Sequence, residues 1–238
     1  MDNILDKTPL KYSIDSVFGG QTCSQLICEE GCGSTKTKYE PFYNLSLEVK
    51  NLKTVYESLD KFIIPEKIED YKCESCNKKI TVTKINSLSQ LPNVLIIHLQ
   101  RIYFDYDNLR NEKCNSRLEF PNVLNLKNYT MEELAKKKLN KVSVKNMGDN
   151  NQQSDMQDKL EEVEIEDTDE IYSRHDSYYE YNLKGVVIHI GSADSGHYYS
   201  YINTIRDGKN YESLYSPEDG THFNSWLEFN DSIVKKFR

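Results

Sequence analysis

The stretch GSADSGHYYSYI, residues 191–202, is the most informative part of this 238-residue chain. A loop of small residues between Gly191 and Gly196 leads into an aromatic run that begins with His197. Small residues keep a backbone permissive and a loop open. The pattern therefore predicts a histidine at the first position of an aromatic strand, accessible from outside. An imidazole with an ordinary pKa of ~6.5 can serve there as a general base, and a purely structural histidine is the alternative.

The sequence on both sides of this loop favours strands. Runs rich in β-branched and aromatic residues, some of them alternating with polar residues, predict strands at 17–26, 42–49, 79–85, 94–102, 181–190, 198–204 and 225–229, with 94–102 buried. Another extended piece begins at 120–121. Residues 52–62 have the spacing of a helix, with Val55, Leu59 and Phe62 on one face. The predicted fold class is α+β, dominated by strands.

A polar pair follows the last predicted strand, in WLEFND, residues 226–231. Asn230 or Asp231 could bond one imidazole nitrogen and fix its tautomer, which is the third role in a Cys-His-Asn/Asp triad. The alternative is an ordinary polar strand end. The remaining histidines are interpreted as structural or surface residues: His98, His175, His189 and His222.

Four cysteines form two close pairs. Cys28 and Cys32 are spaced C-x3-C, and Cys73 and Cys76 are spaced C-x2-C. Two such pairs beside β-type sequence predict a tetrahedral, structural zinc site of the zinc-ribbon kind. Four unrelated buried thiols are the alternative. The other two cysteines, Cys23 and Cys114, have no such pattern and are interpreted as ordinary side chains.

The charge is concentrated in one segment. Between Asp155 and Glu180, eleven acidic residues face only Lys159 and Arg174, which accounts for the net charge of -8. Residues 136–179 are therefore predicted to be a disordered acidic insertion, with an exposed acidic helix at 155–170 as the alternative.

Composition also limits location and partners. The apolar runs are too short to span a bilayer, and no signal peptide is visible, so we expect a cytosolic or nuclear protein with no membrane partner. In that reducing setting, the cysteines indicate metal binding or catalysis rather than disulfide bonds. No basic face for nucleic acid is expected either.

Taken in order, these segments resemble the ubiquitin-specific protease family. The similarity is carried by FGG at 18–20, EPF and LSL at 40–47, LPNVL and HLQR at 91–101, EFP at 119–121, GHY at 196–198 and WLEFND at 226–231. The resemblance implies a papain-like cysteine protease that cleaves after the C-terminal glycine of ubiquitin. Its partners would be ubiquitin and ubiquitinated proteins.

The resemblance also implies roles and boundaries. His197 corresponds to the general base, Asn230 to the residue that orients it, and Asp231 to an assisting acidic position. The two cysteine pairs correspond to zinc ligands at the tip of the fingers. The fingers would span about 17–90, the palm about 91–135 and 180–238, and the acidic insertion about 136–179, with most of the helical thumb absent.

The sequence departs from the family at the nucleophile. The Gly-Asn-Thr-Cys box, which precedes the fingers in the family, is not in this sequence. Cys23 lies on a predicted strand, not at a helix start that would lower its pKa, so it is not expected to be the nucleophile. The chain is also interpreted as truncated before a last palm strand. We expect part of a thiol-dependent deubiquitinase, inactive by itself. A ubiquitin-binding pseudoprotease and a zinc-ribbon protein that binds other proteins or nucleic acid are the alternatives.

Overall fold

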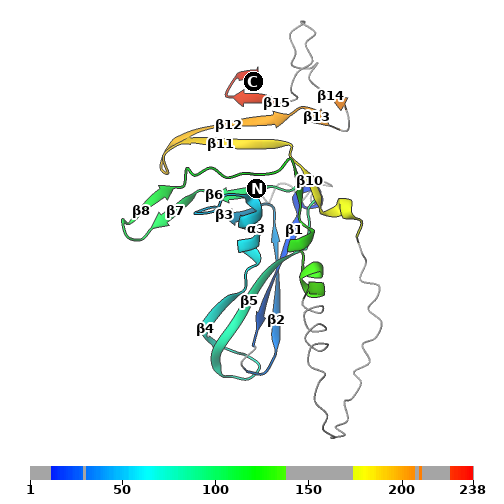
Figure 1. Cartoon of the computed structure of the whole chain (residues 1–238), viewed down its shortest axis with the longest axis vertical. Coiled ribbons are helices and arrows are strands. Elements are labelled where there is room, and N and C mark those ends of the chain that lie inside the picture. The colour runs from blue at the N-terminus through cyan, green and yellow to red at the C-terminus, as the bar shows by residue number, and fades with distance from the viewer. Residues whose placement is uncertain (1–11, 29–30, 138–173, 207–208, 211–225, 238) are drawn as a thin grey trace, which may run out of the picture. The chain divides into compact units, whose positions relative to one another are not determined.

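The computed structural model describes residues 12–28, 31–137, 174–206, 209–210 and 226–237, and strands dominate it (Figure 1). The chain divides into two compact units. The first contains 1–45, 62–96 and 125–180, and the second contains 46–61, 97–124 and 181–238. The β-dominated α+β class is thereby confirmed, whereas the division into fingers, palm and thumb stays a prediction. Among the described residues, no helix has the length and apolar character needed to cross a membrane.

The elements follow one another in this order: α2 (Ser13–Phe18), β1 (Gly20–Ile27), β2 (Thr35–Phe42), β3 (Leu45–Glu48), α3 (Val55–Ile63), β4 (Glu66–Lys72), β5 (Lys79–Gln90), β6 (Ile97–Gln100), β7 (Ile102–Asp105), β8 (Arg110–Lys113), β9 (Val123–Asn125), the 3-10 helix η1 (Lys127–Tyr129), helical residues 131–137, the 3-10 helix η2 (Asp176–Tyr179), β10 (Glu180–Asn182), β11 (Gly185–Gly191), β12 (Gly196–Asn203), β13 (Ile205–Arg206), β14 (Lys209–Asn210), β15 (Trp226–Asn230) and β16 (Ile233–Lys236).

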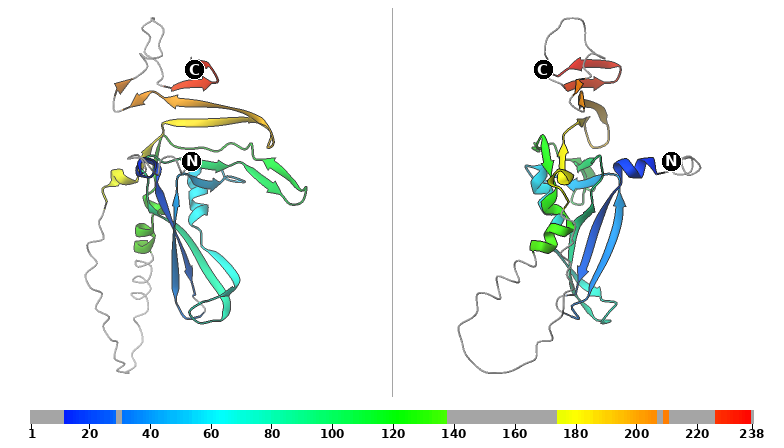
Figure 2. Two further views of the ribbon diagram at one scale, coloured as in Figure 1. Left: turned by 180° about the vertical axis from the view of Figure 1, so that it is seen from behind. Right: turned by 90° about the vertical axis from the view of Figure 1, so that its right-hand side faces the viewer.

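The first unit is built on an antiparallel sheet with the order β2-β1-β5-β4 (Figure 2). The long strand β5 pairs with both β1 and β4, and it supplies the buried Val82 and Leu88. Because β1 ends where β5 begins, the β1–β2 and β4–β5 turns lie at the same end of the sheet. Both turns contain a cysteine pair.

The predicted strand at 17–26 is wrong at its start, because Val17 and Phe18 belong to the helix α2. Two glycines end that helix. The amide of Gly19 donates to the carbonyl of Asp15 at 2.9 Å, and a Cβ at Gly19 would lie 2.4 Å from that oxygen. A Cβ at Gly20 would lie 2.4 Å from the ring of Phe42. The chain therefore leaves α2 through two positions that exclude side chains, and β1 begins at the second.

Two further predicted strands are each divided. The run 42–49 bends at Tyr43 and Asn44, so that β3 pairs with β6 and not with the sheet of β2. The run 94–102 is broken at Arg101, whose amide donates to the Leu99 carbonyl at 2.7 Å. It is also not buried, because Val94 is 46% exposed and β6 alternates between half-buried and exposed residues. Alternation of side chains continues across such breaks, so the sequence pattern does not reveal them.

The predicted helix is confirmed as α3, and its start has a physical cause. The Thr54 hydroxyl accepts from the amide of Glu57 at 3.0 Å, while the Glu57 carboxylate accepts from the amide of Lys53 at 2.6 Å. This near-reciprocal arrangement satisfies amides at the helix N-terminus. Val55 and Leu59 are buried on one face, as the spacing predicted.

The insertion lies mostly outside the described residues, which exclude 138–173. At its C-terminal end, Asp176–Tyr179 forms η2 and Tyr179 is buried, while the bounds of the insertion stay a prediction. Several strands were not predicted, among them β2, β4, β8 and β16, whose residues are mostly polar or exposed. Polar strands lack the hydrophobic alternation that identifies a strand in sequence.

Candidate functional site

Two of the predicted catalytic residues, His197 and Asn230, lie on one antiparallel sheet of the second unit, and Asp231 lies in the turn after β15. The sheet has the order β11-β12-β15-β16, and its first three strands are labelled in Figure 1. On it, His197 pairs with Ile190 across the β11–β12 hairpin. Ser200 of β12 pairs with Phe229 of β15, so Asn230 comes opposite Tyr199. Side chains two residues apart on a strand point to the same face. His197 and Asn230 are therefore diagonal neighbours on a single face, where cross-strand side chains can interact.

The side chains meet at hydrogen-bond distance. Nε2 of His197 lies 2.6 Å from Oδ1 of Asn230. Because the amide oxygen only accepts, Nε2 is the donor in this contact, and in the neutral imidazole Nδ1 then has the lone pair that a general base needs. Asp231 is more distant: its Oδ2 lies 3.9 Å from Nε2 and its side chain is 78% exposed. The structure thus brings together the three residues predicted from sequence, and their catalytic roles stay predictions.

The loop before His197 is shaped by close packing. Gly191 has φ of 120°, a conformation that residues with side chains rarely adopt. A Cβ at Gly196 would lie 2.1 Å from the Ile190 carbonyl oxygen and 2.2 Å from Nε2 of His189. Within the loop, the Ser192 hydroxyl accepts from the amides of Asp194 and Ser195. The small residues therefore make a tight turn possible, in addition to the open access that the sequence suggested.

The other described histidines make local contacts. The ring of His189 stacks on Tyr198 with centroids 4.5 Å apart. Nδ1 of His98 lies 3.3 Å from the Ser46 hydroxyl, and Nδ1 of His175 accepts from the amide of Ser177 at the start of η2. These contacts fit the structural interpretation. His222 lies outside the described residues.

A polar group on the same face as His197 was missed by the sequence analysis. The Tyr201 hydroxyl donates to Glu228 at 3.3 Å, and Lys235 pairs with the same carboxylate at 3.0 Å. Burial, together with the neighbouring Tyr199 and Glu228, raises the pKa of Tyr201 to about 12. The phenol is therefore neutral throughout the physiological range. No spacing along the chain reveals this group, because its members meet only through cross-strand register.

The four cysteines of the two pairs come together in the first unit. Their sulfur atoms all lie within 4.8 Å of one another, and the set could hold a metal ion. The two turns are built alike. The amide of Cys28 donates to Ser34 and its carbonyl accepts from Gly33, and Cys73 makes the equivalent bonds with Lys78 and Asn77.

Residues of positive φ close both turns, with Gly33 at 71° in one and Asn77 at 55° in the other. The first turn contains one more residue between its cysteines, which explains how C-x3-C and C-x2-C spacing produce matching ends. A Cβ on Gly31 would lie 2.5 Å from the Cys28 sulfur and 3.7 Å from that of Cys76, so this position must be glycine for the sulfurs to converge.

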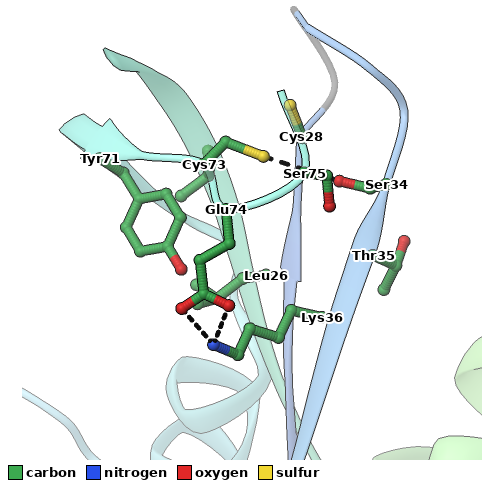
Figure 3. Close-up of a pocket in the computed structure, with 10 residues that line it drawn as sticks. Leu26, Cys28, Ser34, Thr35, Lys36, Tyr71, Cys73, Glu74 and Ser75 are labelled. Carbon is green, nitrogen blue, oxygen red and sulfur yellow. Dashed lines mark hydrogen bonds and ion pairs between the residues drawn. The ribbon is translucent and has the colours of Figure 1, made fainter. Parts of the chain in front are cut away.

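Polar groups lie next to the four cysteines and shift the pKa of Cys73. The Ser34 hydroxyl lies 3.0 Å from the Cys32 sulfur. It also lies 3.7 Å from the Cys73 sulfur, a contact drawn in Figure 3. Hydrogen bonds from the Cys76 and Ser75 amides, with a contribution from Ser34, lower the pKa of Cys73 to about 6. These hydrogen bonds favour the thiolate form of Cys73, which is the form that binds metals. An exposed ion pair between Lys36 and Glu74, at 2.8 Å, lies beside the group.

We expect Gly196→Ala to destabilise the second unit, because the added methyl group meets a backbone oxygen that cannot rotate away. The loss should be about 1–3 kcal/mol in urea unfolding. Gly185→Ala in the same hairpin is the matched control: its Cβ would meet only the Tyr201 carbonyl at 3.4 Å, an ordinary contact. Equal stability of the two variants would contradict the packing argument.

Comparison with known proteins assigns the family. The model of the ubiquitin carboxyl-terminal hydrolase family, UCH, matches residues 5–238. The chain is 31% identical over 231 residues to ubiquitin carboxyl-terminal hydrolase 34 of Mus musculus, covering 96% of this chain and 6% of that protein. It is 32% identical over 210 residues to the probable ubiquitin carboxyl-terminal hydrolase FAF of Drosophila melanogaster, covering 87% and 7% respectively. The chain thus spans less than a tenth of these relatives.

Solved structures agree. The chain is similar to one in the SAGA Ubp8/Sgf11/Sus1/Sgf73 DUB module bound to ubiquitin aldehyde, with a TM-score of 0.61, 27% identity and coverage of 94% of this chain and 38% of that one. For the module bound to monoubiquitin, the TM-score is 0.64 at 27% identity, with 98% and 40% covered. On the match over nearly its whole length, the chain belongs to the ubiquitin carboxyl-terminal hydrolase family.

Proposed function

We propose that the chain provides the general base of a thiol-dependent deubiquitinase that cleaves after the C-terminal glycine of ubiquitin. The observation that carries the proposal is the 2.6 Å contact between Nε2 of His197 and Oδ1 of Asn230. It leaves Nδ1 free of a proton and holds the ring in one orientation. Family membership and the ubiquitin-bound structural relatives support the choice of substrate.

In the proposed reaction, a cysteine from a segment outside this sequence supplies the nucleophile. Nδ1 of His197 removes the thiol proton, and the thiolate attacks the carbonyl carbon of ubiquitin's last glycine. The imidazolium then gives that proton to the leaving amine, which departs as the acyl-enzyme thioester forms. Water, deprotonated by the same imidazole, hydrolyses the thioester. Asn230 orients the ring throughout, and the exposed Asp231 adds a weak electrostatic stabilisation of the imidazolium.

We also propose that the four cysteines bind a structural zinc ion. A tetrahedron of Zn–S bonds of about 2.3 Å has S···S edges of about 3.8 Å. The sulfur of Cys32 lies 3.6 Å from that of Cys28 and 3.9 Å from that of Cys73, which supports this geometry. When bound, zinc would join the β1–β2 and β4–β5 turns. No substrate chemistry is proposed at this site.

Activity tests the first proposal. The chain alone should release no fluorophore from a ubiquitin C-terminal amide, and fusion to the Cys-box segment of a relative should restore release. In that fusion, His197→Ala should lower kcat/KM on the order of 10⁶-fold, because the thiol loses its base. His98→Ala, which removes an exposed histidine, is the control. Ubiquitin binding by a fusion that never turns over would favour the pseudoprotease instead.

The two candidate orienting residues are distinguishable in the same fusion. Asn230→Ala should lower kcat by roughly 10²- to 10⁴-fold, since the imidazole loses the partner that fixes its tautomer. Asp231→Ala should cost less than about tenfold, because an exposed carboxylate at 3.9 Å is screened by water. The reverse order would make Asp231 the orienting residue.

The zinc proposal is tested by metal content. The purified chain should retain about one zinc per molecule after dialysis, measured by plasma mass spectrometry. Cys76→Ser should abolish retention because it removes a ligand. Cys114→Ser, at the cysteine of the second unit, should retain the metal. Zinc bound equally by both variants would place the metal elsewhere.

A further inference from the structure

Among the residues that the structure describes, strand β11 lies at the edge of its sheet, with β12 on one side only. Backbone carbonyls that face away from such a sheet have no strand to pair with. Lys113, the last residue of β8, supplies a partner. Its Nζ lies 3.0 Å from the carbonyl oxygen of His189 and 3.0 Å from that of Gly191. One ammonium group, which has three donors, therefore holds two outward carbonyls two residues apart.

The two carbonyls that Lys113 binds flank the residue of β11 that pairs with His197, the proposed general base. Ile190 lies between them, and Ile190 pairs with His197. Gly191 pairs with Gly196, and the loop begins at this point. The amide of Ser192 then donates to the carbonyl of Ser195 at 2.9 Å. The two hydrogen bonds of Lys113 thus hold the segment of β11 that lies opposite His197, together with the start of the loop that precedes His197.

The backbone around Lys113 is itself held in place. Lys113 pairs with Ile102 in the β7–β8 hairpin. The next residue, Cys114, donates its amide to the Arg101 carbonyl at 2.7 Å, and its own carbonyl accepts from the Arg101 guanidinium at 3.0 Å. Lys113 is half-buried, and its bond to the His189 carbonyl is partly shielded from water, whereas its bond to the Gly191 carbonyl is exposed. A charged donor on a rigid backbone makes a stronger hydrogen bond than a neutral, mobile donor.

We propose that Lys113 is a positioning residue for the proposed catalytic base: by holding the edge of β11, it keeps His197 in register with Asn230. This inference rests on the proposed function for its effect on turnover, but its geometric part concerns only the imidazole and its partner. Removal of the ammonium frees both carbonyls, lets the end of β11 move, and loosens the His197–Asn230 contact.

The test uses the whole 238-residue chain with isotope-labelled histidine. In the natural chain, the ring ¹⁵N shifts of His197 should show Nε2 as the protonated nitrogen. Lys113→Met, which keeps the length of the side chain and removes its N–H donors, should give ring ¹⁵N shifts of His197 that are averaged between the two tautomers. Amide exchange across residues 190–197 should also become about tenfold to a hundredfold faster, as expected for loss of charged hydrogen bonds. Lys113→Arg should restore both.

Arg110→Met is the matched control, because it removes an exposed cation from the same strand, where Arg110 pairs with Glu112. It should leave both measurements unchanged. Unchanged ring shifts in Lys113→Met would overturn the proposal, even if its melting temperature falls, since the lysine would then be only structural. If Lys113→Met does not fold, Lys113→Gln takes its place with the same expected ring averaging.

Turnover in the fusion gives a separate measurement. Lys113→Met should lower kcat more than it raises KM, and Lys113→Arg should recover most of the loss. Failure of the deubiquitinase proposal would show as an inactive natural fusion with His197 still ordered in the spectrum. Failure of the positioning proposal would show as an active fusion whose kcat does not depend on Lys113. The two failures are therefore distinguishable.

Discussion

The pairing of β12 with strands on both sides is the constraint on which the candidate active site depends. Side chains alternate between faces along a strand, so a slip of one residue would move His197 to the opposite face from Asn230. Several features oppose such a slip. Gly191 and Gly196 admit one tight turn, and Lys113 fixes the free edge of β11. Pairing across three strands therefore produces the contact between two residues that are 33 positions apart.

The first unit applies the same physics to a different purpose. Antiparallel pairing of β1 with β5 places two hairpin turns at one end of a sheet. Each turn then needs only local features to direct its sulfurs inward: a residue of positive φ to close it and, in the first turn, Gly31 to leave space. Convergence of the four cysteines is thus a product of strand register and turn geometry together.

Local patterns in the sequence are sufficient to predict part of this structure. The small-residue loop before His197, the two cysteine pairs and the helix α3 each depend on neighbours within a few residues, and each is found where the sequence placed it. Features that depend on pairing could not be read in this way. The Tyr201–Glu228–Lys235 group requires the register of three strands, and the bend at Tyr43 interrupts a run whose alternation continues unchanged.

The residue that contacts the imidazole is an amide, and this choice has a consequence for acid tolerance. A carboxylate partner would take up a proton at a pH of about 4 and lose its strength as an acceptor, whereas the oxygen of Asn230 has no such transition. The hydrogen bond that orients the ring therefore contains no carboxyl group that acid could neutralise. After exposure to acid, a return to neutral pH would find this contact without a partner that must first lose a proton.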